Sequence, residues 1–249
     1  MMQITVPARV RGLLRQIGTT ASERGLQAYA VGGCVRDWMM GRAATADVDV
    51  TVEGDGIGLA QEVAAALQAS TKAHPAFGTA TLILGAPSRR RRIDFASCRR
   101  ETYAKPGAYP TVAAGSIEDD LFRRDFTINA MAAAIAPGRF GVLIDPFSGS
   151  ADLRRRVLRV LHERSFLDDP SRILRGVRFA QRFDFAWEPR TRGLAHSAIA
   201  AGALGWLNAG RVSKELERMA EEPDPRACLE RLADLLSVSA VRVGDAAER

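Results

Sequence analysis

The sequence predicts an α+β protein in which strands and helices alternate up to about residue 147 and helices alone follow. Two observations carry this prediction. Short β-branched runs such as 48–52 alternate with amphipathic segments in the first part. After Asp145-Pro146 no convincing strand pattern follows, and prolines separate several helical patterns. We therefore expect one domain over 1–147 and a helical domain over 148–249.

The elements of the first part follow from periodicity and from turn residues. The predicted helices are 7–26, 34–40, 57–69 and 126–135. The predicted strands are 28–31, 48–52, 79–84 and 93–97. A basic turn over 89–92 joins the last two strands. Residues 101–116 lack periodicity and contain Pro106, Gly107 and Pro110, so this segment is predicted to be a loop.

Composition narrows the classes of function. Hydrophobic residues make up 47% of the chain, enough for a core, and the net charge is +6. Lysine occurs only at 72, 105 and 214, so arginine carries the excess charge. Arginine suits phosphates and base edges, which favours nucleic acid or a polyanionic substrate. A high-GC genome that replaces lysine by arginine explains the same charge equally well.

Three cysteines, Cys34, Cys98 and Cys228, show no paired spacing, so neither a disulfide framework nor a zinc site is predicted. No apolar run approaches membrane-spanning length, and the first residues lack a signal-peptide pattern. We therefore expect a cytoplasmic protein without membrane contact. The sequence leaves the oligomeric state open.

A glycine pair, Gly32-Gly33, follows the predicted strand 28–31. Two glycines at a strand end allow the backbone to approach a ligand closely. The helix that follows presents free N–H groups and a positive dipole end, which suit a triphosphate. Arg36, in the first turns of that helix, is able to add a charge-assisted contact. Taken alone, such a pair usually just makes a turn.

Two carboxylates, Asp47 and Asp49, are spaced i, i+2, which places both on one face of a strand. Closely spaced hard oxygens are what Mg²⁺ binds, and two such ions activate a 3′-hydroxyl and stabilise leaving pyrophosphate. An isolated pair of this kind is usually a solvated strand edge, but the upstream glycines and arginine favour the metal site. Asp94 is either a third carboxylate on a neighbouring strand or an exposed partner of the adjacent arginines.

A second basic segment covers residues 123–130. Asp125 is expected to cap the following helix, which leaves Arg124 free for phosphate. The alternative is a basic helix start that lies near an acid such as Asp120. The segment alone does not decide between these two interpretations.

A third segment covers residues 168–178. Pro170 suits the first helical position with Asp169 as the cap, so Asp169 and Arg172 become neighbours at the helix start. Arg175 and Arg178 continue the row. An Asp acceptor beside an Arg donor is able to pair with the Watson–Crick edge of a base. Simple capping with a surface row of salt bridges is the competing interpretation.

Five segments occur in one order, namely VGGCVRDWMMG, DVDVT, RRDFTINAMA, LIDPFSGSADL and DDPSRILRGVRFA. This order resembles class II CCA-adding enzymes and the related bacterial poly(A) polymerases, of the polymerase β nucleotidyltransferase superfamily. The resemblance runs from about residue 28 to 183 and weakens to a helical pattern over 211–217. It implies a nucleotidyltransferase head with a mixed sheet, followed by an all-α neck and body that selects the nucleotide and binds RNA.

The resemblance also implies roles for individual residues. The pair that matches the family's metal-binding carboxylates is Asp47 and Asp49, with Asp94 as the candidate third acid. The positions that match nucleotide-holding residues are Gly33, with Gly32 beside it, Arg36 and Arg124. The positions that match the amino-acid template for the incoming base are Asp169 and Arg172, supported by Arg175 and Arg178.

The implied activity is transfer of CMP and/or AMP from CTP and ATP to the 3′ end of tRNA, with release of pyrophosphate. Full CCA addition, CC-only or A-only addition and poly(A) synthesis stay open. The family positions its template with the loop at 101–116, and the shortness of this loop here favours partial activities. A non-catalytic RNA-binding protein on this fold would lack a carboxylate or a template residue, and none is missing. A basic structural protein explains the charge but not the ordered motifs.

Two features depart from the family pattern. Asp168 stands where the family commonly has glutamate; base specificity is expected to survive, because the first acid does not touch the base. The shorter side chain is expected to bear on the switch from C to A. Family members also usually continue through further helical regions that grip tRNA, so this chain is either truncated or a naturally short member.

Overall fold

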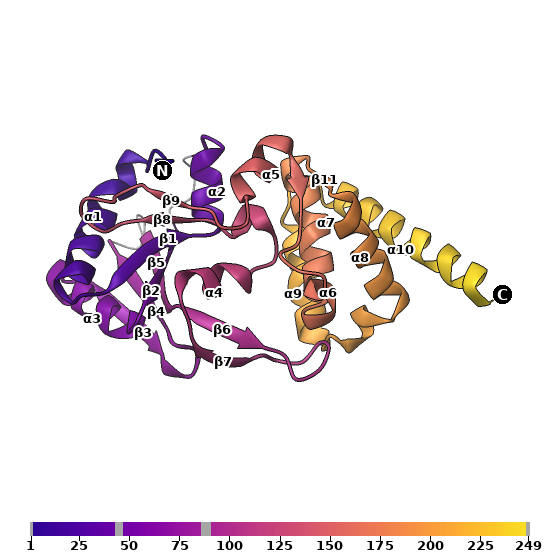
Figure 1. Cartoon of the computed structure of the whole chain (residues 1–249), viewed down its shortest axis with the longest axis horizontal. Coiled ribbons are helices and arrows are strands. Elements are labelled where there is room, and N and C mark those ends of the chain that lie inside the picture. Colours follow the sequence, from indigo (N-terminus) through magenta and orange to yellow (C-terminus); the bar gives the residue numbers. More distant parts are fainter. Residues whose placement is uncertain (1, 43–46, 86–90, 248–249) are drawn as a thin grey trace. The chain divides into compact units, whose positions relative to one another are not determined.

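The computed structural model describes residues 2–42, 47–85 and 91–247 (Figure 1). The chain forms two compact units. The first, here called the sheet unit, comprises Met1–Glu101, Val112–Arg124 and Ile128–Ser150. The second, the helical unit, comprises Thr102–Thr111, Asp125–Thr127 and Ala151–Arg249. The helical unit therefore takes two short segments from the first half of the sequence, and the single boundary at 147 stays a prediction.

The sheet unit is built on a seven-stranded mixed sheet in the order β3-β4-β5-β2-β1-β8-β9. Its strands are β1 Gln27–Val31, β2 Val48–Glu53, β3 Ser70–His74, β4 Thr79–Leu84, β5 Arg91–Ser97, β8 Ala132–Ala134 and β9 Leu143–Ile144. Strands β2 and β5 run parallel, whereas the other neighbouring strands are antiparallel. The mixed sheet implied by the family resemblance is thus confirmed.

Two long helices, α1 and α3, pack against the sheet and against each other (Figure 1). The helices of this unit are α1 Ala8–Glu23, α2 Gly33–Met39, α3 Gly56–Leu67, α4 Ile117–Phe122 and the 3-10 turn η1 Pro75–Phe77. Helix α1 buries Val10, Leu14 and Ile17 at helical spacing, as its apolar pattern predicts. These contacts fix the layer that supports β1 and β2.

The helical unit packs α7 against α9 and sets α10 against α7, α8 and α9 (Figure 1). The elements of this part are α5 Gly149–Arg155, α6 Ser165–Asp168, α7 Ser171–Phe183, α8 Pro189–Ala200, η4 Ala203–Trp206, α9 Ala209–Ala220, α10 Pro225–Ala247 and the parallel pair β10 Val157–Leu158 with β11 Ala186–Trp187. Aromatic rings of Phe126, Phe179 and Trp187 meet edge to face in its core. The described residues contain no helix long and apolar enough to cross a membrane.

The predicted helix 126–135 is wrong. The structure has a 3-10 turn, η3 Thr127–Asn129, followed by strand β8, which pairs with β1 on one side and β9 on the other. Residues 130–135 are almost completely buried, so the run is apolar on all sides and carries no period that separates strand from helix. Pairing on both sides satisfies the backbone of this buried segment.

The loop and boundary predictions also need correction. Within 101–116 the structure forms the end of β6 Arg99–Thr102 and strand β7 Thr111–Ala114, which pair in a small sheet. Strand β3 was not predicted, and two-residue strands do follow residue 146. In the predicted turn 89–92, Arg89 and Arg90 lie outside the described residues, whereas Arg91 and Arg92 belong to β5.

Gly18 provides a test of how α1 packs on the sheet. A Cβ at Gly18 would lie 1.8 Å from the backbone oxygen of Ile135, whereas a Cβ at Gly12 on the same helix would meet nothing within 4 Å. Gly18→Ala should lower the free energy of unfolding by about 1–3 kcal/mol through overpacking. Gly12→Ala, the control, should raise it by roughly 0.5–1 kcal/mol, because alanine favours helix. Urea unfolding measures both, and equal stabilisation by the two changes would contradict this packing.

Candidate active site

A cavity of about 360 Å³ lies in the sheet unit and combines acidic and basic side chains. Asp49 of β2 and Asp94 of β5 line it, together with Thr81 of β4. Arg92 and Arg124 line it as well. The cavity is therefore lined both by carboxylates, which bind cations, and by guanidinium groups, which bind phosphates.

The parallel register of β2 and β5 brings two of the predicted acids together. Asp49 is the direct partner of Asp94 across the strand pair, so both side chains project from the same face of the sheet. Asp47 stands one residue before β2 begins, two positions upstream of Asp49, and is exposed. Asp47 is not among the residues that line the cavity, but its charge acts on Asp49, so the two carboxylates lie near each other.

Asp94 has partners of its own. The hydroxyl of Thr81 donates to Asp94 Oδ1 at 2.6 Å, and Arg92 Nε donates to the same oxygen at 3.0 Å. Arg92 Nε also lies 2.8 Å from Oδ2. Asp94 is thus both a neighbour of Asp49 and the partner of an adjacent arginine, which joins the two interpretations left open by the sequence. Arg92 is one of the adjacent arginines that the sequence offered as partners of Asp94. Thr81 was not singled out from the sequence, because nothing in a strand pattern marks a cross-strand partner.

The charges around Asp49 oppose one another. Asp49 is exposed at the cavity surface, yet desolvation by the protein packed around its carboxyl raises its pKa; the nearby carboxylates of Asp94 and Asp47 raise it further, whereas Arg124 and Arg92 lower it. The net result is a raised pKa. A positive charge in addition to these two arginines would relieve the remaining repulsion between the acids.

A divalent cation fits the donor set at Asp47 and Asp49. Among the residues that the structure describes, no group of three or more histidine, cysteine or acidic side chains forms a cage for a metal ion. Mg²⁺ does not need such a cage, since it commonly uses one or two carboxylates and completes its shell with water and substrate phosphates. The carboxylates of Asp47 and Asp49, two positions apart in the chain, meet that requirement.

Arg124 lies beside the glycine turn as well as at the cavity. A Cβ at Gly32 would come 2.5 Å from Arg124 Nη1, so only glycine leaves room for this guanidinium. Gly32 also has a positive φ of 73°. Arg124 Nη2 donates to Asp120 at 2.9 Å, while its buried Nε has no hydrogen-bond partner among the described residues. An anionic oxygen in the cavity would satisfy this type of donor.

Asp120 holds Arg123 and Arg124 through ion pairs. Its side chain is completely buried and accepts from Arg123 at 2.7 Å and from Arg124 at 2.9 Å. Burial alone would raise the pKa of Asp120, but the two guanidiniums outweigh burial and hold the pKa below its ordinary value. The pairing with Asp120 is therefore present, and Arg124 nevertheless faces the cavity. Asp125 accepts from the N–H of Phe126 at 2.8 Å, but no regular helix follows it.

Helix α2 begins at Gly33, directly after the turn at Gly32. Arg36 is buried in this helix rather than lining the cavity. Its guanidinium donates to Asp37 at 2.9 Å and to the side-chain oxygen of Asn129. A buried cation requires such partners, and these bonds tie α2 to the turn that precedes β8. The nucleotide contact implied for Arg36 stays a prediction.

In the helical unit, α7 begins at Ser171, one residue later than predicted. The Asp169 carboxylate accepts from the Ser171 N–H at 3.0 Å and from the Ser171 hydroxyl, and it pairs with Arg211. Arg172 is buried and donates to Ser165 at 2.7 Å. The two predicted template residues thus have different partners. Asp169 binds the N–H of the first residue of α7, but the cap position of this helix is Pro170, whereas the sequence predicted Asp169.

Arg211, at the start of α9, is a site residue that the sequence did not single out. The only available signal was the weak helical resemblance over 211–217. Asp168, the acid that departs from the family pattern, ends α6 and lies 3.3 Å from Arg164 and 4.0 Å from His162. It therefore faces a different set of partners from Asp169.

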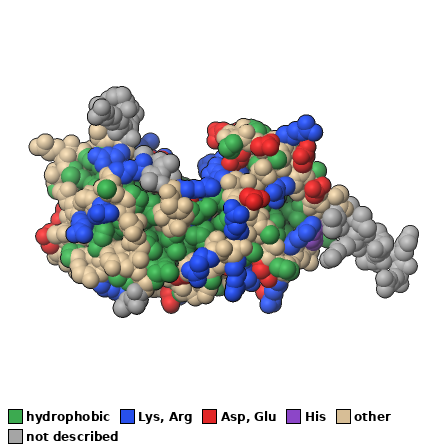
Figure 2. All heavy atoms as spheres, turned by 90° about the horizontal axis from the view of Figure 1, so that it is seen from above, with side chains coloured by type: hydrophobic (Ala, Val, Ile, Leu, Met, Phe, Trp, Pro, Cys, Tyr) green, Lys and Arg blue, Asp and Glu red, His purple; other side chains and the backbone are tan. Residues whose placement is uncertain are grey.

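The remaining arginines of α7 are held by acids. Arg175 donates two hydrogen bonds to Asp125, the longer at 2.8 Å, and its Nη1 lies 3.7 Å from Glu215. Arg178 lies 3.6 Å from Glu215 and 3.4 Å from Glu222. Both glutamates are buried, so these pairs are internal rather than a surface row. Figure 2 shows basic and acidic side chains interspersed on one face of the helical unit.

With this geometry established, comparison with known proteins decides the family. The model of the poly A polymerase head domain matches residues 28–159, which is more than half of the chain. The chain belongs to this family. The resemblance predicted from the five ordered motifs is confirmed.

Relatives of this poly A polymerase head-domain protein process tRNA ends. An A-adding tRNA nucleotidyltransferase of Halalkalibacterium halodurans is 42% identical over 90% of this chain and 52% of its own length. A CC-adding tRNA nucleotidyltransferase of Deinococcus radiodurans is 37% identical over 78% of this chain and 50% of its own length. A solved CCA-adding enzyme, apo form II, superposes with a TM-score of 0.87 at 38% identity, over 94% of this chain and 57% of that chain. The chain spans about half the length of these relatives.

Acid titration tests the ion pairs at Asp120. Because the pKa of folded Asp120 is depressed, its stabilising contribution is complete above the ordinary pKa of 3.8 and is lost as the pH falls through the lower folded value. Asp120→Asn should therefore cost roughly 3–5 kcal/mol near pH 7. This difference from the wild type should shrink below about pH 4.

Chemical unfolding at a series of pH values measures the difference. Glu118→Gln, which removes an exposed acid from the same helix α4, serves as the control and should cost at most about 1 kcal/mol. A difference for Asp120→Asn that stays constant down to pH 3 would show that its charge is not responsible.

Proposed function

We propose that the chain transfers CMP, AMP or both from CTP and ATP to the 3′ end of tRNA and releases pyrophosphate. The observation that carries this proposal is the cavity in which Asp49 and Asp94 lie opposite each other with Arg124 beside them, in a member of this family. One similar solved structure is a tRNA nucleotidyltransferase complexed with a primer tRNA and an incoming ATP analog, and another is a CCA-adding enzyme with CTP. These ligands support the same substrate classes here.

The second candidate is addition of A alone. Three relatives that are 42%, 40% and 46% identical are A-adding tRNA nucleotidyltransferases, whereas other relatives are CC-adding or multifunctional CCA proteins.

We extend the proposal to the organisation of the chain: residues 1–147 act as the nucleotidyltransferase head, and 148–249 act as the neck and body that select the nucleotide and bind RNA. A cytoplasmic location belongs to the same proposal.

The reaction forms a bond between the primer's 3′-oxygen and the α-phosphorus of the nucleotide, and it breaks the bond to the β-phosphate. Such in-line transfer depends on positioning and charge neutralisation. Asp47 and Asp49 would hold Mg²⁺, which supplies positive charge to the phosphates when bound. Arg124, which lines the cavity, would bind a phosphate oxygen through its guanidinium. Asp94 would accept the proton of the 3′-hydroxyl, in an orientation fixed by Thr81 and Arg92.

Glycine and arginine residues of the first motif would shape the phosphate side of this cavity. Gly32 leaves space for Arg124, and Gly33 lets α2 begin at once after the turn. Arg36 would act by holding α2 to Asn129 rather than by touching the nucleotide.

Base selection is proposed for Asp169 and Arg172 at the start of α7. Asp169 would accept from the exocyclic amino group that CTP and ATP share, and Arg172 would donate to a ring acceptor. Both residues would then exchange their present partners, Arg211 and Ser165, for the base. Arg175 and Arg178 would keep α7 in place through their internal ion pairs.

Asp49→Ala tests the catalytic proposal. Removing one of two carboxylates that bind the cation should reduce nucleotide addition by about a thousandfold or more, since the charge stabilisation is worth several kcal/mol. The fold should persist, because a repelling charge is removed. Addition is measured with ATP on tRNA ending in CC and with CTP on tRNA lacking CCA. Asp234→Ala, an exposed acid of α10, is the control; near-normal turnover by Asp49→Ala would exclude the proposed site.

Asp169→Ala tests base selection. Loss of a bidentate contact worth roughly 1–3 kcal/mol should relax the exclusion of UTP and GTP by about ten- to a hundredfold and slow the use of CTP or ATP. Ser171→Ala is the matched control, because it removes a hydrogen-bond partner of Asp169 and leaves the carboxylate in place. Single-turnover rates with all four nucleotides are compared with thermal melts. If Asp169→Ala only melts earlier and keeps the wild-type ranking, Asp169 is a helix cap and nothing more.

A further inference from the structure

Tyr109 is the most exposed large apolar side chain among the described residues, with 75% of its surface accessible. It lies in the segment Thr102–Thr111, which belongs to the helical unit. A single exposed ring is ordinary in itself. What distinguishes Tyr109 is that neighbouring side chains hold its ring in a defined position at the surface.

Two residues at the start of α9 fix the ring. Asn208 donates from its side-chain nitrogen to the Tyr109 hydroxyl at 3.1 Å. The side-chain oxygen of Asn208 accepts from the N–H of Arg211 at 2.9 Å and so caps α9. The guanidinium carbon of Arg211 lies 5.8 Å from the centre of the Tyr109 ring. The orientation of the ring is therefore tied to a helix start.

The backbone that carries Tyr109 is also anchored. The N–H of Gly107 donates to the Leu167 oxygen at 2.9 Å. A Cβ at Gly107 would lie 2.9 Å from the Cβ of Trp206, so the chain passes close to η4 and has a positive φ of 69° there. Ala108 closes a turn by donating to the Lys105 oxygen at 3.2 Å. The ring is thus presented by an ordered turn, so little conformational entropy remains to be lost when a ligand binds.

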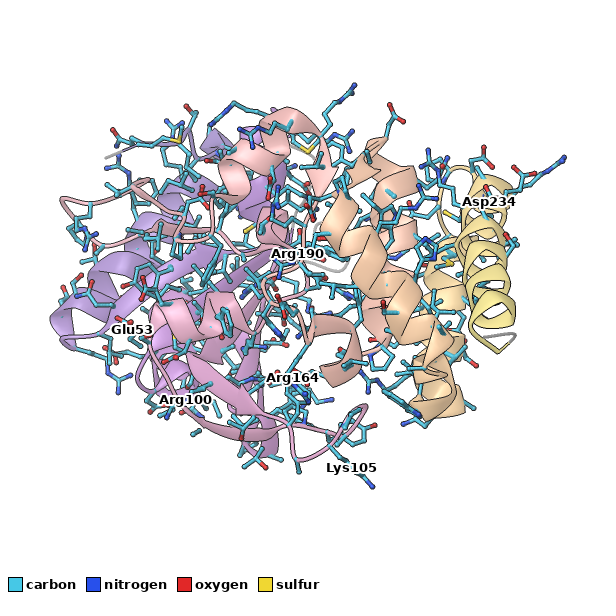
Figure 3. All side chains as sticks on the ribbon, turned by 45° about the vertical axis from the view of Figure 1, so that its right-hand side comes forward. Glu53, Arg100, Lys105, Arg164, Arg190 and Asp234 are labelled. Atoms are coloured by element: carbon cyan, nitrogen blue, oxygen red, sulfur yellow. The ribbon has the colours of Figure 1, made fainter. Side chains whose placement is uncertain are left out.

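The surroundings of the ring match a nucleotide. Arg211 contacts the ring and also pairs with Asp169, so ring, cation and the proposed base-selecting acid are connected through one side chain. Lys105, on the same turn, is exposed and points away from the ribbon (Figure 3). Arg211 lies over one face of the exposed Tyr109 ring, so a base would stack on the other face. Stacking of unpaired bases on aromatic rings contributes about 1–3 kcal/mol per base, with little preference for sequence. An apolar protein partner would not favour the flanking charges.

We propose that Tyr109 is a stacking platform for one unpaired nucleobase. The base comes either from a bound nucleoside triphosphate or from the 3′ end of an RNA. The proposal rests on the proposed function for the class of ligand, but not on turnover. Stacking adds affinity without reading the base edge, whereas Asp169 and Arg172 are proposed to read it.

The test measures equilibrium binding by the 249-residue chain in low salt. One arm titrates ATP and CTP with Mg²⁺ by calorimetry. The other arm titrates a labelled RNA that ends in CC and the same RNA with an abasic last nucleotide, by fluorescence anisotropy. The variants are Tyr109→Ala, Tyr109→Leu, which keeps apolar bulk without an aromatic face, and Tyr109→Phe, which keeps the ring. Phe77→Ala, a change to another ring that is 70% exposed, is the control.

Tyr109→Ala and Tyr109→Leu should weaken binding about five- to a hundredfold in one arm, whereas Tyr109→Phe should stay within about threefold of wild type. Loss for the triphosphates identifies the nucleotide as the source of the base. Loss for the normal RNA but not for the abasic RNA identifies the RNA end. Phe77→Ala should change neither arm, and thermal melts should match the wild type.

The proposal is overturned if Tyr109→Leu binds like the wild type, if loss is equal for normal and abasic RNA with triphosphate binding unchanged, or if the wild type binds neither ligand. Failure of the catalytic proposal gives a different pattern. A wild-type chain that adds no nucleotide, yet binds in a way that depends on the Tyr109 ring, retains the platform and rejects the transferase assignment.

Discussion

The crowding of carboxylates on one face of the sheet is the constraint on which the rest of the site depends. The parallel register of β2 and β5 sets Asp49 beside Asp94, at the spacing of neighbouring strands, roughly 5 Å. Asp47 adds a third negative charge nearby. Desolvation is the largest cause of the raised pKa of Asp49, and the charges of Asp94 and Asp47 add to it. Folding tolerates such an arrangement only when cations stand close by, and Arg92 and Arg124 fill that need. The positions of Arg92 and Arg124 are therefore in part a consequence of the clustered acids.

Holding Arg124 in turn imposes structure on two distant segments. Its partner Asp120 must be buried to fix it, and Gly32 must lack a side chain to admit it. Arg36 joins the same two segments again through Asn129, 93 residues away along the chain. The glycine motif and the second arginine motif thus form one structural assembly. In the proposed reaction, Asp120 and Gly32 therefore act by positioning Arg124. A buried charged group is stable only when its partners are fixed.

The extent to which the fold was predictable follows from what a local pattern contains. The predicted strands 28–31, 48–52, 79–84 and 93–97 match β1, β2, β4 and β5 closely, since each is bounded by turn residues or a charge run. The same-face placement of Asp47 and Asp49 was predicted from the pleat alone; Asp47 lies one residue before β2, so this placement stays a prediction. The alanine-rich β8 was misread as helix, because a segment buried on both faces has no period. The bond between Tyr109 and Asn208 spans 99 residues, and no local pattern encodes such a pair.

The arginine excess also has a different meaning once the partners are known. The arginine-rich composition predicted binding to a polyanion. However, Arg172 and Arg178 are buried, and Arg175 forms an ion pair with Asp125. These cations stabilise α7 and contribute little to a field that attracts RNA, since each lies against an acid or a hydroxyl. The charge that remains for phosphate is carried by exposed side chains such as Lys105 and Arg164, the latter 60% exposed although it lies near Asp168 (Figure 3). Net charge alone therefore overstates the basic surface of this unit, and affinity for RNA requires uncharged contacts as well. A base stacked on an aromatic ring is such a contact. Stacking on Tyr109, as proposed, would add affinity for RNA that the charges of this unit do not supply.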